Sequence, residues 1–302
     1  MSEWLIGLEG TQAGHRAALG LALLAAFLHA VFGALQKGRL DPWLSRGVID
    51  AALVALSLPV ALWVVPRPEG VMWAILAGAV AIHFVYKLLQ ALAYSRGAYT
   101  VVYPVVRGTG PLITVIGAWL LFGEVFTPLQ WLGVAVLLAG IFGLAAYNML
   151  FLVPARDTLL PALGLAVATG LLVALYTTYD AFGIRAAPDP FTFLGWFFLL
   201  TSFDFPLMVM LRPGLRRRLT GLAWPPLVRR GLLGALVAYG SFGSVMLATR
   251  LDKVGEAAVL RETSTVFAAL IGWLALGETV GPRRIALMTL VAAGAVIVEM
   301  GS

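Results

Sequence analysis

Long apolar segments, each ended by charged residues, proline or glycine, follow one another along almost the whole chain. Each is close to the roughly 20 residues that an α-helix needs to cross the hydrocarbon layer of a membrane. No barrel-like alternation is visible, and an open sheet in lipid would leave backbone groups unpaired, so strands are excluded. The pattern predicts ten membrane-spanning helices, at residues 17–35, 48–65, 71–92, 99–122, 128–148, 160–183, 191–211, 231–249, 255–276 and 282–300. The only sizeable loop is expected at residues 212–230.

The second half of the chain repeats the first. The sequence Ala-Leu-Gly-Leu-Ala at residues 18–22 recurs at 162–166, and Asp41-Pro42 recurs as Asp189-Pro190. A constant offset of 154 relates further pairs, namely Arg107 and Arg261, Thr109 and Thr263, Trp119 and Trp273, Gly123-Glu124 and Gly277-Glu278, Pro128 and Pro282, and Gly140 and Gly294. This many matches in one register indicate a duplication, with repeats at residues 17–148 and 160–300.

Each repeat contains five predicted helices, and because five is odd, the two copies must cross the membrane in opposite directions. Inverted repeats of this kind are related by a pseudo-two-fold axis in the membrane plane, and carriers built this way bind their substrates near the midplane. The predicted fold class is an all-α polytopic membrane protein with ten transmembrane helices in two inverted five-helix repeats.

Composition supports lipid as the solvent of this chain. Of the 302 residues 61% are apolar and 12% charged, whereas soluble domains are about 45–50% apolar and about 25% charged. The spans and short loops leave no room for a soluble domain. The N-terminus carries Glu3 and Glu9 without a basic segment, so we expect no cleaved signal peptide but insertion directed by the first span. The absence of cysteine excludes disulfides and thiolate metal sites.

The net charge of +6 comes from basic residues scattered over the loops, which act as orientation signals in a membrane protein. Nucleic-acid binding is therefore not expected. Five loop lysines and arginines fall on the side of both termini and thirteen on the opposite side, which includes the loop at residues 212–230. The positive-inside rule then places this loop in the cytoplasm and both termini outside.

Two sequence blocks resemble the junction between the fourth and fifth helices of the drug/metabolite transporter superfamily, EamA-type branch. The first block is Leu-Phe-Gly-Glu at residues 121–124, followed by Pro-Leu-Gln-Trp-Leu-Gly at 128–133 and Leu-Ala-Gly at 138–140. The second copy has Leu-Gly-Glu at 276–278, with Pro282 and Gly294, and keeps less of the fifth helix. The resemblance covers essentially the whole chain and implies transport of small metabolites, without indicating which one. It also suggests that both termini are inside, against the charge count, which we weigh more heavily.

Ionisable side chains within spans cost about 2.5–3.5 kcal/mol each on insertion scales, so they normally face a polar interior. Tyr103 and Arg107 lie on one face of the fourth helix, and Lys87 and Gln90 on one face of the third. A guanidinium holds carboxylate or phosphate by two parallel hydrogen bonds, and a lysine acts as a point charge. The predicted substrate-binding residues are His29, Lys87, Gln90, Tyr103, Arg107, Tyr176, Asp180, Ser241, Arg261 and Glu262.

A structural interpretation stays open for these charges, because Arg107 and Arg261 can pair with Glu262 or Asp180 to fix helix packing. Glu124 and Glu278 end helices and are interpreted as fold residues. Small residues on the fifth and tenth helices, including Gly140 and Gly294, permit close backbone approach and predict a pair that joins the halves away from the substrate. No catalytic serine motif, paired-histidine metal motif or phosphate-binding loop is found.

The function predicted from the sequence is secondary transport of a small anionic or zwitterionic metabolite, amino-acid-like or carrying phosphate or phosphonate, by alternating access. An exporter of cationic drugs with the same fold is the first alternative. It is disfavoured because small multidrug members of the superfamily rely on an acidic residue in the first helix, where this chain has His29 and no carboxylate. A membrane enzyme or lipid scramblase is the second. We expect a monomer in the cytoplasmic (inner) membrane, in contact with membrane lipids, with a coupling proton or counter-substrate and without a cofactor, a metal or catalytic residues.

Overall fold

The computed structural model describes residues 2–36, 41–96, 99–151, 159–276 and 281–302, and within these ranges the only regular structure is helical. A short helix, α1 (Glu3–Ile6), comes first. The first repeat consists of α2 (Gln12–Gln36), α3 (Pro42–Pro59) with its π-helical continuation η1 (Val60–Val64), α4 (Met72–Arg96), α5 (Tyr99–Phe122) and α6 (Pro128–Phe151). The second consists of α7 (Leu159–Ala186), α8 (Pro190–Thr201), α9 (Asp204–Leu211), α10 (Pro213–Thr220), α11 (Trp224–Leu251), α12 (Val254–Arg261), α13 (Ser264–Leu276) and α14 (Pro282–Met300). The predicted all-α fold class is confirmed.

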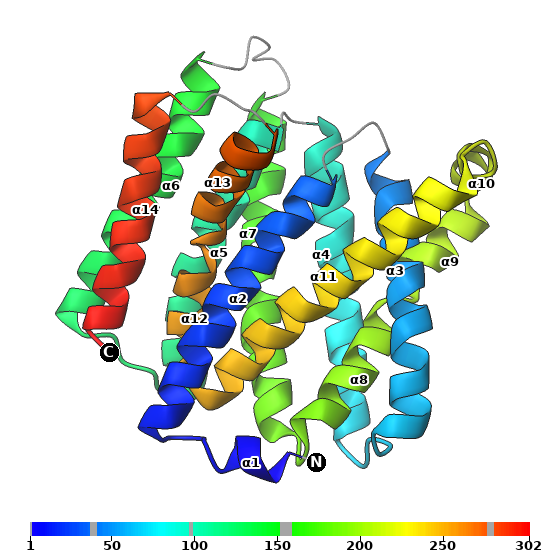
Figure 1. The fold of residues 1–302 in the computed structure, drawn as a ribbon, viewed down its shortest axis with the longest axis horizontal. Coiled ribbons are helices and arrows are strands. Elements are labelled where there is room, and N and C mark those ends of the chain that lie inside the picture. The colour runs from blue at the N-terminus through cyan, green and yellow to red at the C-terminus, as the bar shows by residue number, and fades with distance from the viewer. Residues whose placement is uncertain (1, 37–40, 97–98, 152–158, 277–280) are drawn as a thin grey trace.

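Within the described ranges, nine segments are long and apolar enough to cross a membrane. The remaining predicted span forms α14, a helix of 19 residues that carries Arg283, Arg284 and Glu299. It packs along α6, and both chain ends lie toward the same end of the molecule (Figure 1). A chain that crosses a membrane an even number of times has both ends on the same side, so this placement agrees with ten crossings. The exact count of ten stays a prediction.

The helices differ from the sequence-based expectation in two ways. Two predicted spans are each broken, one into α8 and α9 and the other into α12 and α13. The expectation of a loop at residues 212–230 is wrong, because this segment contains α10 and the first turns of α11. Pro213 begins α10, where the missing N–H costs nothing. Three arginines make α10 too polar to be found by a search for apolar runs.

The repeated Asp-Pro pair begins the second helix of each repeat. The Asp41 carboxylate accepts a hydrogen bond from the Trp43 N–H at 2.9 Å, and the Asp189 carboxylate accepts one from the Thr192 N–H at 2.8 Å. Burial would raise the pKa of Asp189, but hydrogen bonds from Ser2 and Thr192 lower it below its ordinary value. Each aspartate therefore satisfies an N–H group that the first helical turn leaves free.

The contacts between helices are matched in pairs across the two repeats. α2 packs against α11 and α13, and its counterpart α7 packs against α4 and α5, the counterparts of α11 and α13. Likewise α3 contacts α11, and α8 contacts α4. α6 and α14 pair with each other, as do α3 and the α8–α9 segment. Such an exchange of partners is what a two-fold relation between the repeats produces.

Glycines bring the backbones of α6 and α14 into contact. A Cβ atom on Gly294 would lie 2.4 Å from the backbone nitrogen of Leu137, and one on Gly133 would lie 2.7 Å from the carbonyl oxygen of Gly294. Gly140 approaches the carbonyl of Leu287 in the same way. These glycines allow a separation that no larger residue permits, and α6 and α14 thereby join the two halves.

Candidate functional site

A polar cavity of about 50 Å³ lies between the two halves, enclosed by α2, α3, α4, α5, α7 and α11. Five of the predicted binding residues line it, namely His29, Gln90, Tyr103, Arg107 and Tyr176. Arg46, Tyr86 and the aromatic side chains of Phe32 and Phe242 complete the polar and aromatic part of its wall. Arg46 is not among the residues predicted from the sequence, because it lies before the predicted start of the second span, whereas α3 begins at Pro42.

The wall of this cavity is cationic and aromatic. The charged side chains that line it are the guanidinium groups of Arg46 and Arg107, and no carboxylate is found among the described lining residues. The Gln90 amide donates a hydrogen bond to the Tyr86 hydroxyl at 2.7 Å, which orients both groups. Guanidinium groups and hydroxyls suit an oxyanion such as carboxylate or phosphate, and the rings provide apolar contact to the rest of a small molecule.

Arg107 is buried and joins the two halves. Its Nε atom lies 2.8 Å from a carboxylate oxygen of Glu262, which pairs the two side chains. Its Nη2 atom donates to the carbonyl oxygen of Arg261 at 3.1 Å and to the Ser264 hydroxyl at 2.9 Å. The Tyr103 ring lies 5.9 Å from its guanidinium carbon. Arg107 therefore both lines the cavity and holds the broken helix of the second half.

Arg261, the repeat counterpart of Arg107, is in a different environment. Its side chain is 4% exposed and its guanidinium lies over the Phe242 ring at 4.8 Å, behind the wall of the cavity. The Nε and Nη2 atoms of Arg261 have no hydrogen-bond partner among the described residues. A buried cation with unused donors is costly, so this position favours an anion that supplies the missing acceptors.

Lys87 does not line the central cavity. It borders a separate cavity of about 30 Å³ beside Arg46 and His83. Its ammonium group lies 2.9 Å from carboxylates of both Asp50 and Asp204, and it also donates to the carbonyl of Thr201. An ammonium group has three donors, and these three contacts use them all. Substrate binding by Lys87 would require one of these contacts to break.

Lys87 and Arg107 make equivalent contacts at the two helix breaks. Lys87 bonds the carbonyl of Thr201, the last residue of α8, and the carboxylate of Asp204, the first residue of α9. Arg107 bonds the carbonyl of Arg261, the last residue of α12, and the carboxylate of Glu262 directly after it. A cation from the first half thus satisfies the carbonyl that each break leaves without its intrahelical partner.

The remaining predicted residues make contacts between helices. The His83 Nε2 atom lies 2.8 Å from the Asp180 carboxylate, and the His83 ring packs against Tyr176 at 4.7 Å between centroids. The Ser241 hydroxyl donates to the carbonyl of Ala25 at 2.8 Å. Asp180 and Ser241 are therefore engaged with protein groups, and their binding roles stay predictions.

Glu124 is not near the central cavity. Its carboxylate accepts hydrogen bonds from the N–H groups of Val254 and Gly255 at 2.8 and 3.0 Å, at the start of α12, and it pairs with Arg185 at 3.2 Å. These contacts fit its interpretation as a fold residue. Its repeat counterpart Glu278 lies outside the described residues.

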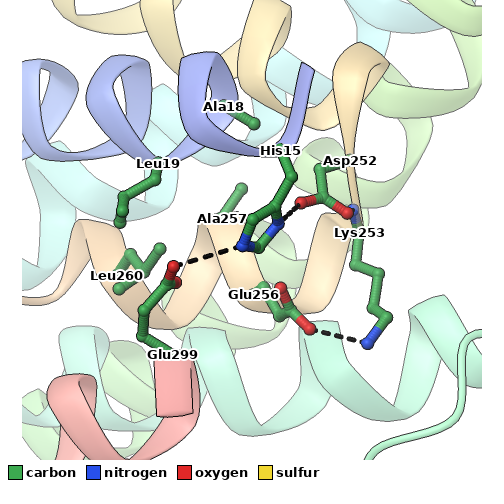
Figure 2. Close-up of a pocket in the computed structure, with 9 residues that line it drawn as sticks. All are labelled: His15, Ala18, Leu19, Asp252, Lys253, Glu256, Ala257, Leu260 and Glu299. Atoms are coloured by element: carbon green, nitrogen blue, oxygen red, sulfur yellow. Dashed lines mark hydrogen bonds and ion pairs between the residues drawn. The ribbon is translucent and has the colours of Figure 1, made fainter. Parts of the chain in front are cut away.

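A second polar site, the termini-end cluster, consists of His15, Asp252, Lys253, Glu256 and Glu299 around a cavity of about 10 Å³ (Figure 2). The His15 Nδ1 atom contacts the Asp252 carboxylate, and its Nε2 atom lies 3.2 Å from Glu299. Carboxylates only accept hydrogen bonds, so His15 can donate to both of them at once only as an imidazolium. This site was not predicted from the sequence, because His15 precedes the predicted first span, whereas α2 begins at Gln12.

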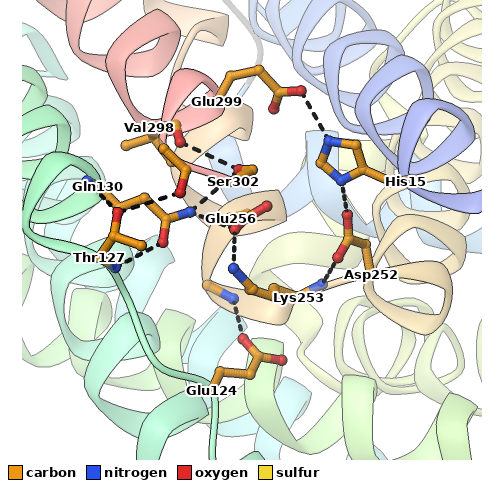
Figure 3. A network of polar contacts seen from close by, with 12 residues as sticks. His15, Glu124, Thr127, Gln130, Asp252, Lys253, Glu256, Val298, Glu299 and Ser302 are labelled. Carbon is orange, nitrogen blue, oxygen red and sulfur yellow. Dashed lines mark hydrogen bonds and ion pairs between the residues drawn. The ribbon is translucent and has the colours of Figure 1, made fainter. Parts of the chain in front are cut away.

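The termini-end cluster connects four elements. Glu256 accepts from Lys253 at 2.7 Å and from the Gln130 amide of α6 at 2.5 Å (Figure 3). His15 thereby ties α2 to α14 and to the turn between α11 and α12. His15, Asp252 and Glu256 have ligand atoms within 4.8 Å of one another, a spacing that suits a metal ion. However, Lys253 and a protonated His15 balance two of the three carboxylate charges, so the arrangement does not depend on a metal.

Comparisons with known proteins agree with this architecture. The chain matches the EamA-like transporter family over residues 16–146 and again over residues 160–300. A solved structure described only as the crystal structure of a protein superposes with a TM-score of 0.73 and 17% sequence identity, over 96% of this chain and 98% of the other. At this identity the likeness shows the fold alone. No curated protein matches the sequence. The two family matches together span nearly the whole chain, which therefore belongs to the EamA-like transporter family, a branch of the drug/metabolite transporters.

Proposed function

We propose that this chain is a secondary carrier that moves a small organic anion or zwitterion across the cytoplasmic membrane by alternating access. Its family is a family of membrane transporters, which supports transport without conversion of the substrate. The observation that carries the choice of substrate is the charge around the central cavity. Arg46 and Arg107 line it, and the buried Arg261 behind its wall has unused donors. Asp50 pairs with Arg46 at 2.9 Å and Glu262 with Arg107 at 2.8 Å, but neither carboxylate is among the described lining residues, so a cationic drug would meet guanidinium groups and no acidic side chain on the wall.

The geometry suggests how binding and movement are linked. A substrate carboxylate or phosphate that reaches Arg107 competes with Glu262 for the same guanidinium, since the two are paired at 2.8 Å. Glu262 lies at the break between α12 and α13, so releasing it frees the hinge of that span. A movement of Arg261 toward the cavity then supplies a further cation. The carrier acts as a monomer, and the negative group of the substrate takes the place of Glu262 on Arg107.

The test is uptake of labelled solutes into liposomes that contain the purified protein. A thermal-shift screen of metabolites first selects candidates, because a ligand at 100 times its Kd stabilises the folded state by about 2.7 kcal/mol. Arg261→Gln should reduce uptake of the selected anion at least about tenfold. A tenfold loss of affinity corresponds to only about 1.4 kcal/mol of binding free energy, less than the loss of one charged contact can cost. The matched control is Arg67→Gln, which changes an exposed arginine outside the spans and should transport normally.

Two results would reject the proposal. One is chemical conversion of the labelled solute, which would indicate a membrane enzyme. The other is faster uptake of organic cations than of organic anions by the same liposomes, which would indicate a cation exporter. Equal uptake by Arg261→Gln and the wild type would remove Arg261 from the site.

A further inference from the structure

A further cavity, larger than the central one, lies on the outer surface of the bundle. It has a volume of about 420 Å³, compared with about 50 Å³ for the central cavity, and is enclosed by α3, α9, α10 and α11. We call it the lateral groove. Every residue that lines it is apolar, and two of them, Met210 and Trp224, are more than half exposed. Because α3, α9 and α11 belong to segments long and apolar enough to cross a membrane, we expect this groove to face lipid.

Small residues line the lateral groove on two of its helices. Gly47, Ala51 and Ala55 line it from α3 and Gly231 from α11. From Gly47 to Ala55 the α3 backbone rises about 12 Å, at 1.5 Å per residue, so the groove is elongated along the helix. An elongated apolar groove of this kind matches an extended hydrocarbon chain better than a compact molecule.

The end of the lateral groove is strongly basic. Leu219 of α10 and Trp224 at the start of α11 line it there, and α10 projects from the bundle next to α3 and α9 (Figure 1). Arg212 precedes α10, and Arg216, Arg217 and Arg218 lie within it, all of them exposed. Among the described residues, the acidic partner of this group is Asp41, which pairs with Arg218 at 3.0 Å.

Arg216 and Arg217 thus add positive charge that no neighbouring carboxylate balances in the described contacts. Arg212 extends the basic surface toward the membrane, with its guanidinium over the Trp43 ring at 5.6 Å. Tryptophan is enriched at the level of lipid headgroups, so this stacking places the arginines at the height of phosphate groups.

We propose that the lateral groove binds one anionic phospholipid, with an acyl chain along α3 and the phosphate against the arginines of α10. Charge complementarity selects this ligand, because a zwitterionic phospholipid brings its own ammonium group to a basic surface. Basic segments next to spans attract anionic lipids with about 1 kcal/mol per lysine or arginine. The positive-inside orientation expected for this chain puts α10 on the cytoplasmic face, where the surface potential is negative.

The site also lies beside the helix break of the seventh span. Pro206 and Met210 of α9 line the groove, and α9 begins at Asp204, which pairs with Lys87. A lipid seated between α3 and α9 therefore supports the segment that carries one of the two hinges. This inference does not depend on the identity of the transported substrate.

The binding test uses the full-length protein, purified and stripped of lipid in detergent, and native mass spectrometry. Palmitoyl-oleoyl phosphatidylglycerol and phosphatidylcholine, which have the same acyl chains, are titrated separately and in competition. We expect one tightly retained phosphatidylglycerol and an at least tenfold weaker retention of phosphatidylcholine. Glycerol phosphate, which has the charge without the chains, should not displace the bound lipid. Equal retention of the two lipids, or displacement by glycerol phosphate, would overturn the proposal.

Two variants separate the groove from its basic end. Ala51→Trp fills the groove at an exposed position, and the Arg216→Gln/Arg217→Gln pair removes charge from α10. Each should lower phosphatidylglycerol retention at least tenfold while the melting temperature without lipid stays unchanged. Ala135→Trp on the exposed face of α6 and the Arg283→Gln/Arg284→Gln pair on α14 are the matched controls.

The two pairs of variants give distinct outcomes. If both control variants retain lipid normally and both groove variants lose it, the site is established. If only the arginine variant loses lipid, binding is a surface charge effect, and the proposed groove site is rejected. The same conclusion holds if the controls weaken binding as much as the groove variants.

Discussion

At the scale of single residues, Arg107 and Arg261 show how one sequence signal can lead to different environments. The constant offset identifies them as counterparts, and both side chains are buried. Among the described residues, only Arg107 of these two has a carboxylate partner within 4 Å, Glu262, although Glu262 directly follows Arg261 in sequence. The sequence therefore predicts which charges lie in the spans. It cannot predict which cation is paired, because pairing depends on helix rotation and on contacts between the halves.

This difference leads to a prediction about stability. Arg107→Gln leaves the Glu262 carboxylate buried without its partner, which should destabilise the protein by about 3–5 kcal/mol. The Arg107→Gln/Glu262→Gln double variant removes both charges and should recover most of that loss while still failing to transport. Thermal unfolding of the single and double variants in detergent measures both effects. A single variant that melts like the wild type would show that this pair is not structurally required.

At the scale of elements, the positions of most spans follow from apolar length, and the two helix breaks do not. The breaks at residues 202–203 and 262–263 contain no glycine or proline. Instead, Thr263 and Thr265 donate their hydroxyls to the carbonyls of Leu260 and Glu262, each at three residues' distance. Serine, threonine and aspartate compete in this way with helical hydrogen bonds. That local signal is weak, and the deciding contacts come from Lys87 and Arg107 in the other half.

The contact between α6 and α14 is open to a direct test. Gly294→Val would place a side chain against the backbone of Leu137, which lies 2.4 Å from the position of a Cβ atom. Backbone cannot move aside there, so we expect loss of the folded protein. Gly20→Ala is the matched control, since it lies on the exposed side of α2 with nothing within 4 Å, and it should fold with equal or slightly higher stability. Size-exclusion profiles of both variants measure the result, and a folded Gly294→Val would contradict the predicted contact.

The termini-end cluster predicts a pH-dependent opening. When His15 loses a proton, one of its ring nitrogens can no longer donate a hydrogen bond to Asp252 or Glu299. One link between α2 and its neighbours is then lost. Ala257→Cys, at the cavity wall, reports this opening by maleimide labelling, and the chain has no native cysteine to interfere. The labelling rate of Ala257→Cys is divided by that of an exposed Thr220→Cys reference, which corrects for thiolate formation. This ratio should rise as the pH increases, because the cluster opens. His15→Gln should remove this change, and a ratio that stays constant with pH in the wild type would rule out the mechanism.

At the scale of the whole molecule, the duplication and the family were predictable from the chain alone, because both rest on matches at fixed spacing. The placement of the cavity between the halves also follows from inversion. The lateral groove was not predictable, since alanine and glycine on α3 resemble any packing surface until α9 and α11 are in place. The residues of α10 were visible as a basic cluster but were interpreted as a loop.

Orientation in the membrane is a property of the whole chain and stays a prediction. The thirteen loop lysines and arginines on one side, against five on the other, place α10 in the cytoplasm and both termini outside. A C-terminal alkaline phosphatase fusion should therefore be active in the periplasm. A C-terminal green fluorescent fusion that is bright, with an inactive phosphatase fusion, would show the opposite orientation.

The two helix breaks both lie in the second half, while their first-half counterparts continue, α3 into η1 and α5 without interruption. A pseudo-symmetric carrier with identical halves would present the same site, with the same affinity, to either compartment. With hinges in one half only, the two open states differ in which segments bend, and so in how Arg107 and Glu262 face the substrate. We therefore expect unequal half-saturation concentrations for exchange measured from the two sides of a liposome. Net flux at equilibrium is still zero, as thermodynamics demands, but the carrier loads more readily from one side than from the other.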